Sequence, residues 1–174
     1  MRIFIAIDLP EDIKKDIYNI SKNIRGISGK IVEEENIHIT LKFLGQINQE
    51  TLNKINKKLS SINYNKFYIN IGDFGYFNNR VLWIKILNKE NIINLHNIID
   101  NKLYELNIQK DIDYEPHITI YRIKNIKNDN YLKEYLNENK KIYSNILIDK
   151  FYIKESILMT HGPVYRNLYE YKLL

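Results

Sequence analysis

The sequence predicts an α+β fold of two pseudo-symmetric lobes, with antiparallel sheets lining a central cleft and helices on the outside. Two observations support this prediction. The tripeptide His-Ile-Thr occurs twice, at residues 38–40 and 117–119. Each copy also has the same place in one order of expected elements: strand, helix, motif strand, helix, strand. We therefore expect a single domain of 174 residues made of two sequence repeats, about 1–77 and 78–174.

Apolar residues alternate where a strand is expected and recur every three or four positions where a helix is expected. In residues 11–24 the spacing is helical, and acidic residues come early, as the helix dipole prefers. The alternation in the first motif strand predicts that Phe43 is buried. In order, the first half is predicted to contain strand 2–8, helix 11–24, a short strand 30–33, a motif strand ending at Gly45, a helix capped by Asn48 and ending near residue 61, and strand 66–74.

The second half is predicted to repeat this order after a turn at Asn78-Asn79. No linker rich in Gly, Pro or Ser separates the halves, so we expect the two lobes to pack closely. The expected elements are strand 81–87, helix 90–106, motif strand 114–124, a short helix 131–136, a long strand 145–158 with possible breaks, a loop at Gly162-Pro163 and a last strand 165–174.

The composition excludes several classes of protein. The chain has no cysteine, which rules out thiolate catalysis and cysteine-bound zinc. Its net charge of +5 and its pI of about 9.1 favour an anionic partner such as nucleic acid. No apolar run is long enough to span a membrane, and the apolar amino-terminal stretch is too short for a signal peptide. We therefore expect a cytoplasmic protein with no membrane contact.

Each His-Ile-Thr tripeptide presents a histidine and a threonine on one face of a strand, because successive side chains point to opposite faces. The chain has only four histidines and four threonines, and random placement would give about 0.09 His-x-Thr tripeptides. An imidazole beside a hydroxyl can contact one anionic ligand. His38, Thr40, His117 and Thr119 are therefore the candidate site, and the other two histidines are expected to be structural.

Five stretches of the sequence occur in the order found in one family of enzymes. They are Arg2–Pro10, His38–Gly45, Arg80–Trp83, Pro116–Arg122 and the segment from Glu155 to Tyr165. Through these stretches nearly the whole chain resembles the 2H phosphoesterase superfamily. The resemblance is greatest to its RNA 2′,3′-cyclic phosphodiesterase branch, also called the 2′-5′ RNA ligase family.

This resemblance implies that water opens an RNA 2′,3′-cyclic phosphate to leave a 2′-phosphate, and that the same site can run backwards as a ligase. Two histidines can supply the acid and the base near pH 7, because the unperturbed pKa of histidine is about 6.5. We assign His38 as the acid and His117 as the base, an order that the residues do not fix. Thr40 and Thr119 are expected to donate hydrogen bonds to phosphate oxygens.

The sequence gives no reason to expect a cofactor. Neither motif has the spacing of a metal site, so we expect catalysis without metal. No phosphate-binding loop of the Walker type is present, so ATP is not expected to bind. The expected partners are RNA ends or small cyclic nucleotides, and the protein is expected to be a monomer.

Four further residues are candidates for substrate contacts. Arg122 would add positive charge for phosphate, but strict alternation places it opposite His117, so it needs a bulge or a strand end to reach the cleft. A surface ion pair is the alternative for Arg122. Lys42 shares the parity of the first motif and would steer the RNA backbone, unless it is a solvated lysine. Tyr121 and Tyr165 would stack a nucleobase, although for Tyr165 we favour ordinary packing.

Two alternative functions remain open from the sequence. The same site can act on another cyclic phosphodiester or on a 2′-5′ nucleotide. The chain can also be a non-catalytic module that binds RNA ends with its histidines. Substitution of His117 separates these functions, because an enzyme loses turnover whereas a binding module loses affinity.

Overall fold

The computed structural model of the chain describes residues 1–77 and 80–174. The turn predicted at Asn78-Asn79 lies outside these residues. In chain order the elements are β1 (Arg2–Asp8), α1 (Glu11–Ser21), β2 (Ile27–Ile31), the 3-10 turn η1 (Glu34–Asn36), β3 (His38–Gln46), α2 (Gln49–Leu59), β4 (Phe67–Phe77), β5 (Val81–Ile86), α3 (Glu90–Tyr104), β6 (His117–Ile126), α4 (Asp129–Glu138), β7 (Ile142–Ile148), β8 (Lys150–Met159) and β9 (Gly162–Lys172).

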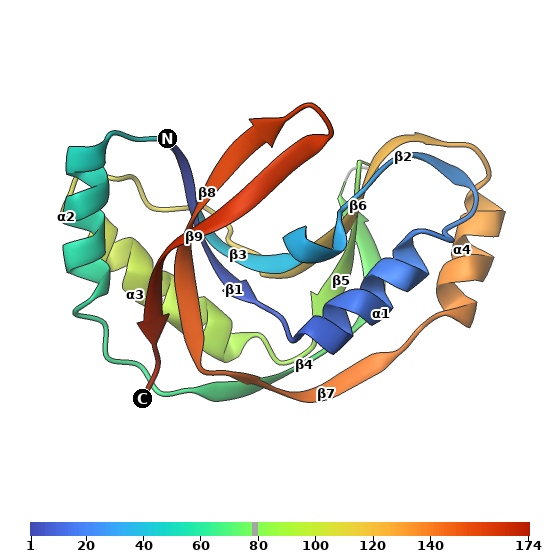
Figure 1. The fold of residues 1–174 in the computed structure, drawn as a ribbon. Helices are drawn as coiled ribbons and strands as arrows, with labels where there is room; N and C mark the ends of the chain where they lie inside the picture. Colours follow the sequence, from blue (N-terminus) through green and yellow to red (C-terminus); the bar gives the residue numbers. More distant parts are fainter. Residues whose placement is uncertain (78–79) are drawn as a thin grey trace.

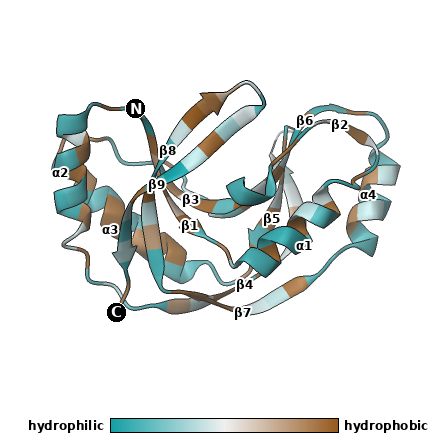
Figure 2. Ribbon diagram, in the orientation of Figure 1, coloured by the Kyte–Doolittle hydropathy of each residue, from teal (hydrophilic) through white to brown (hydrophobic). Residues whose placement is uncertain are grey.

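The strands form two antiparallel sheets, which confirms the predicted α+β class (Figure 1). The first sheet has the order β3-β1-β8-β9, and the second has the order β2-β6-β5-β4-β7. Helix α3 packs against β3 and α2, whereas α1 packs against β6 and η1. One continuous cluster of buried apolar side chains, rich in isoleucine, extends through both sheets and their helices. Figure 2 shows these apolar residues concentrated on β1, β3 and the inner side of α3.

The two sheets exchange strands between the halves of the sequence. Strands β2 and β4 come from the first half but pair within the second sheet, next to β6 and β5. Strands β8 and β9 come from the second half, and β8 pairs with β1 in the first sheet. Each sheet therefore depends on both halves of the chain, which ties the two halves together.

Two predictions about the last third of the chain concern its strands. The long strand predicted at 145–158 with possible breaks is interrupted at residue 149, where the chain leaves the second sheet after β7 and enters the first sheet at β8. The other prediction is wrong. Gly162-Pro163 is not a loop but the first pair of residues of β9. The turn lies one step earlier, at 160–161, and Gly162 has φ +132°, a conformation that favours glycine. Strands β8 and β9 thus form a hairpin whose turn extends toward β2 (Figure 1).

Within the described residues, no helix is long and apolar enough to cross a membrane.

Candidate active site

His38 and His117 are the first residues of β3 and β6, and their rings are held in the same way. The Nδ1 of His38 lies 2.7 Å from the carbonyl oxygen of Asn36, and the Nδ1 of His117 lies 2.8 Å from the carbonyl oxygen of Glu115. A carbonyl oxygen only accepts hydrogen bonds, so each Nδ1 carries the proton in the neutral ring. Each Nε2 is therefore the nitrogen left for proton transfer.

The environment of His38 keeps its ring neutral. Burial is the main cause that lowers the pKa of His38, to about 4, and the positive charge of Lys154 adds to it. The Nε2 of His38 lies 2.8 Å from the Oγ1 of Thr40. Because the Nε2 of the neutral ring has no proton, the threonine hydroxyl donates this hydrogen bond. The first His-x-Thr motif is thus a connected pair before any ligand binds.

The two motifs face one another in the fold. Strands β3 and β6 are in contact, although they belong to different sheets. Among the smaller causes that lower the pKa of His38 is the charge of His117. The hydroxyl of Tyr114, just before β6, donates a 2.7 Å hydrogen bond to the carbonyl oxygen of Thr40. The structure therefore brings the two motif strands together.

A bulge in β3 changes the faces of Lys42 and Phe43, the residues that follow it. The register with β1 shifts between Thr40 and Lys42, so Leu41 is an extra residue in the strand. Phe43 consequently lies opposite Phe4 and is 70% exposed, so the prediction that it is buried is wrong. Lys42 lies on the opposite face of the strand from Phe43 and is buried.

The prediction that Lys42 contacts the RNA backbone is also wrong. Its side chain is only 1% exposed, and its Nζ lies 2.5 Å from Asp100 and 3.0 Å from Asp111. These two carboxylates and His96 have ligand atoms close enough to surround a metal ion. The Lys42 ammonium pairs with both carboxylates, so the group forms an ion-pair cluster that is buried except for the exposed Asp111. His96 completes it by contacting the carbonyl oxygen of Leu41, the bulged residue, at 2.8 Å.

A second bulge follows the second motif at the equivalent position. The register between β5 and β6 shifts so that Ile120 is the extra residue. Arg122 thereby returns to the face of His117, as its predicted role requires, and it is exposed. Burial raises the pKa of the Tyr165 hydroxyl, and the positive charge of Arg122 partly opposes this rise. Tyr121, predicted to point at the cleft, instead packs against the core, so that prediction is corrected.

Aromatic rings surround both histidines. The Tyr165 ring lies 5.4 Å from His38 and 4.8 Å from Phe4, and the Phe4 ring lies 5.2 Å from His38. In the second half, the Trp83 ring lies 5.6 Å from His117. Phe4 and Trp83 each precede their histidine by 34 residues, a spacing in the sequence that could have revealed them. Tyr165 is thus placed at the site, as a packing partner of His38.

The sequence analysis also missed Lys154 and Asp8. Lys154 is buried, its Nζ lies 2.9 Å from Asp8, and Asp8 pairs with His38 in the register of β1 and β3. Their charges act on His38 in opposite directions, Lys154 lowering its pKa and Asp8 raising it. No motif marks this pair, because β8 reaches β1 only through the exchange of strands between the halves.

Comparisons with known proteins identify relatives of this chain. The family model described as LigT-like phosphoesterase matches residues 7–83 and 85–165. The chain is 36% identical to the RNA 2′,3′-cyclic phosphodiesterase of Methanocaldococcus jannaschii, over 98% of this chain and 100% of that protein. It is 34% identical to the enzyme of the same name from Archaeoglobus fulgidus, over 97% and 98% of the two chains.

Solved structures share the fold. A structure from Thermus thermophilus, named TT0787, has a TM-score of 0.80 at 25% identity and covers 99% of this chain and 97% of its own. Escherichia coli LigT complexed with 3′-AMP has a TM-score of 0.78 at 23% identity, over 99% and 96% of the chains. The two His-x-Thr motifs, their common geometry and these matches lead to one conclusion: the chain belongs to the LigT-like phosphoesterases of the 2H family.

Proposed function

We propose that this phosphoesterase hydrolyses RNA 2′,3′-cyclic phosphate ends to 2′-phosphates by acid and base catalysis from His38 and His117. The proposal rests on the finding that the imidazole rings of His38 and His117 are fixed by the same kind of hydrogen bond. Both Nδ1 atoms are fixed by a carbonyl oxygen two residues earlier, so proton transfer falls to the two Nε2 atoms, and the Thr40 hydroxyl that donates to the Nε2 of His38 turns to the phosphate when substrate binds. The curated relatives named RNA 2′,3′-cyclic phosphodiesterase support the choice of substrate.

In this mechanism His117 takes a proton from water, and the water oxygen attacks the phosphorus. The bond from phosphorus to the ribose O3′ breaks, and His38 donates a proton to O3′. The products are a 2′-phosphate and a free 3′-hydroxyl. Proton transfer of this kind contributes about 10²–10⁴-fold to the rate. The same steps with a ribose 5′-hydroxyl in place of water give 2′-5′ ligation: His117 takes the hydroxyl proton, O5′ bonds to phosphorus, and the bond from phosphorus to O3′ breaks.

The acid role of His38 requires it to gain a proton when substrate binds. In the free site its pKa is lowered to about 4, so at neutral pH the ring is uncharged. A cyclic phosphate brings a negative charge next to the ring, which raises the pKa of the histidine. We therefore infer that substrate binding takes up a proton at His38.

The remaining site residues have supporting roles in this proposal. Thr40 and Thr119 donate hydrogen bonds to the phosphate oxygens, where charge accumulates in the transition state. Arg122 supplies a fixed positive charge, and the exposed ring of Phe43 offers a face for a nucleobase. No step uses a metal or ATP. We further propose that the protein acts as a monomer in the cytoplasm.

Incubation of the purified protein with a short RNA ending in a 2′,3′-cyclic phosphate, in EDTA, tests the proposal. Chromatography should show a 2′-phosphate as the product. His117→Ala should lower turnover by about 10²–10⁴-fold while the affinity for a 2′-phosphate RNA changes little. Thr51→Ala, on α2, is a control that should keep full turnover.

Two other outcomes favour the alternatives. A faster reaction with a 2′-5′ dinucleotide or a different cyclic phosphodiester would transfer the same mechanism to another substrate. Absence of turnover on every cyclic phosphate, together with RNA binding lost in His117→Ala, would identify a non-catalytic module for RNA ends.

A further inference from the structure

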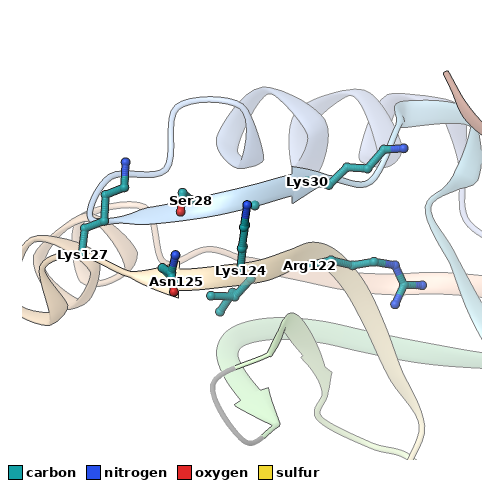
Figure 3. Close-up of a pocket in the computed structure, with 8 residues that line it drawn as sticks. Ser28, Lys30, Arg122, Lys124, Asn125 and Lys127 are labelled. Atoms are coloured by element: carbon teal, nitrogen blue, oxygen red, sulfur yellow. The ribbon is translucent and has the colours of Figure 1, made fainter.

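A basic groove follows the paired strands β2 and β6 away from the catalytic histidines (Figure 3). It has a volume of about 760 Å³ and is open to solvent. Its polar lining consists of Ser28, Lys30, Arg122, Lys124, Asn125 and Lys127. An open, basic track of this kind suits an extended polyanion better than an enclosed small molecule.

Backbone geometry forms the floor of the groove. Lys30 lies directly opposite Arg122, and the register then shifts between Ser28 and Gly29. A Cβ atom at position 29 would come within 2.1 Å of the carbonyl oxygen of Arg122 and within 2.9 Å of the backbone nitrogen of Lys124. Only glycine fits at position 29, so no side chain projects into the groove from this residue. The register shift leaves Lys124 as an extra residue on β6.

The groove concentrates cations that lack acidic partners. Lys30, Arg122, Lys124 and Lys127 are all exposed, and no acidic residue lines the groove. Among the residues that the structure describes, no ion pair involves any of these four. Many other surface lysines are neutralised, as Lys133 is by Asp129 at 2.7 Å. Unpaired cations in a row attract a phosphate backbone, because binding releases the counterions of that backbone.

The groove is continuous with the catalytic site. Arg122 lines the groove and, because Ile120 is an extra residue in β6, lies on the same face of that strand as His117. Lys30 connects the groove to the β8–β9 turn by donating a 3.3 Å hydrogen bond to the carbonyl oxygen of His161. Figure 3 shows Lys30 and Arg122 extending in the same direction from their two strands.

We propose that this groove binds the phosphodiester backbone of the nucleotides that precede the cyclic phosphate, so that the substrate is an RNA strand rather than a mononucleotide. The inference rests on the proposed function. A cyclic phosphate occupies the 3′ end of its strand, so the rest of the RNA extends only toward the 5′ end. The groove gives that segment its phosphate contacts, while Ser28 and Asn125 present polar groups to the sugars.

Paired substrates test this proposal. An RNA of about five nucleotides with a 2′,3′-cyclic phosphate end should have a kcat/KM at least about tenfold above that of a mononucleoside 2′,3′-cyclic phosphate. The double substitution Lys124→Ala, Lys127→Ala should remove most of this advantage and leave the mononucleoside rate unchanged. Lys57→Ala, Lys66→Ala removes the same charge from exposed positions outside the groove and should keep the advantage.

A binding measurement provides a readout that does not depend on turnover. Fluorescence anisotropy with the 2′-phosphate product RNA should give a plot of log affinity against log salt. The slope should fall by about 1.4 in the groove variant, because each lost phosphate contact removes about 0.7. Equal kcat/KM for both substrates, or an unchanged salt slope in the groove variant, would overturn the proposal. If no cyclic phosphate is hydrolysed, the proposed function fails, and the salt slope still decides whether the groove binds RNA.

Discussion

At the scale of single residues, the protonation of His38 links the site to the stability of the protein. Its pKa is about 4 in the folded protein and about 6.5 in an unfolded chain. Between these two values the unfolded state binds more protons than the folded state. The stability present above pH 6.5 is therefore lost progressively as the pH falls toward 4.

Denaturant unfolding of the wild type and of His38→Gln checks this effect. Between pH 7 and pH 4.5, the free energy of unfolding of the wild type should fall by about 2 kcal/mol more than that of the variant. All other titrating groups are common to both proteins and cancel in the comparison. Identical pH dependence of the two proteins would show that burial does not control the charge of His38.

Residue-level reasoning from the sequence identified the chemistry of the site but not all of its members. His38, Thr40, His117 and Thr119 were found because a repeated tripeptide is visible in one dimension. Lys154 was missed, because it approaches His38 only through the pairing of β8 with β1. A contact between strands that are far apart in the sequence produces no local pattern of residues from which it could be predicted.

At the scale of elements, one extra residue in each motif strand decides what faces the substrate. Strict alternation over β3 predicts Lys42 at the site and Phe43 in the core, and the bulge at Leu41 reverses both. The bulge at Ile120 does the same for Tyr121 and Arg122. Alternation predicts faces correctly only while the register is unbroken, and a bulge depends on the partner strand.

The buried cluster around Lys42 should be essential for the bulge in β3. Lys42→Met leaves the carboxylate of Asp100 buried without its cation, and such losses cost about 3–5 kcal/mol. Urea unfolding measures this change. Lys54→Met breaks an exposed ion pair with Glu50 and should cost less than about 1 kcal/mol. Similar losses in both variants would mean that the cluster contributes no more than a surface pair.

At the scale of the whole molecule, the β8–β9 hairpin joins the two sheets next to the site. The buried side-chain Nδ2 of Asn36 donates a 2.8 Å hydrogen bond to the carbonyl oxygen of Pro163, while the backbone carbonyl oxygen of Asn36 accepts the hydrogen bond from His38. The sequence predicted two lobes and their antiparallel sheets. It could not predict that β2, β4 and β8 pair in the sheet of the other half, because the positions of strands along the sequence do not specify which strands pair with each other.

Loss of the Asn36 side chain should loosen this hairpin. A hydrogen bond of this kind contributes about 1 kcal/mol, so Asn36→Ala should make local opening about fivefold more frequent. Hydrogen exchange of the amides in 157–166 should accelerate by that factor, whereas exchange in β4 and β5 should stay as in the wild type. Unchanged exchange in the hairpin would mean that other contacts secure it.

We infer that the two halves arose as a repeat, and the separate matches of the family model to residues 7–83 and 85–165 support this inference. Phe4 and Trp83 fit the same idea, since each places an aromatic ring beside the histidine of its own half.

The pairing of β1 with β8 also has a consequence during synthesis. The strand that begins at Arg2 pairs early with β3, but its other partner, β8, is made roughly 150 residues later, which takes on the order of 10 s at the usual speed of a ribosome. Until the β8–β9 hairpin has docked, His38 has the Phe4 ring beside it but neither Tyr165 nor Lys154. The environment that keeps His38 neutral is therefore among the last parts of the fold to assemble during synthesis.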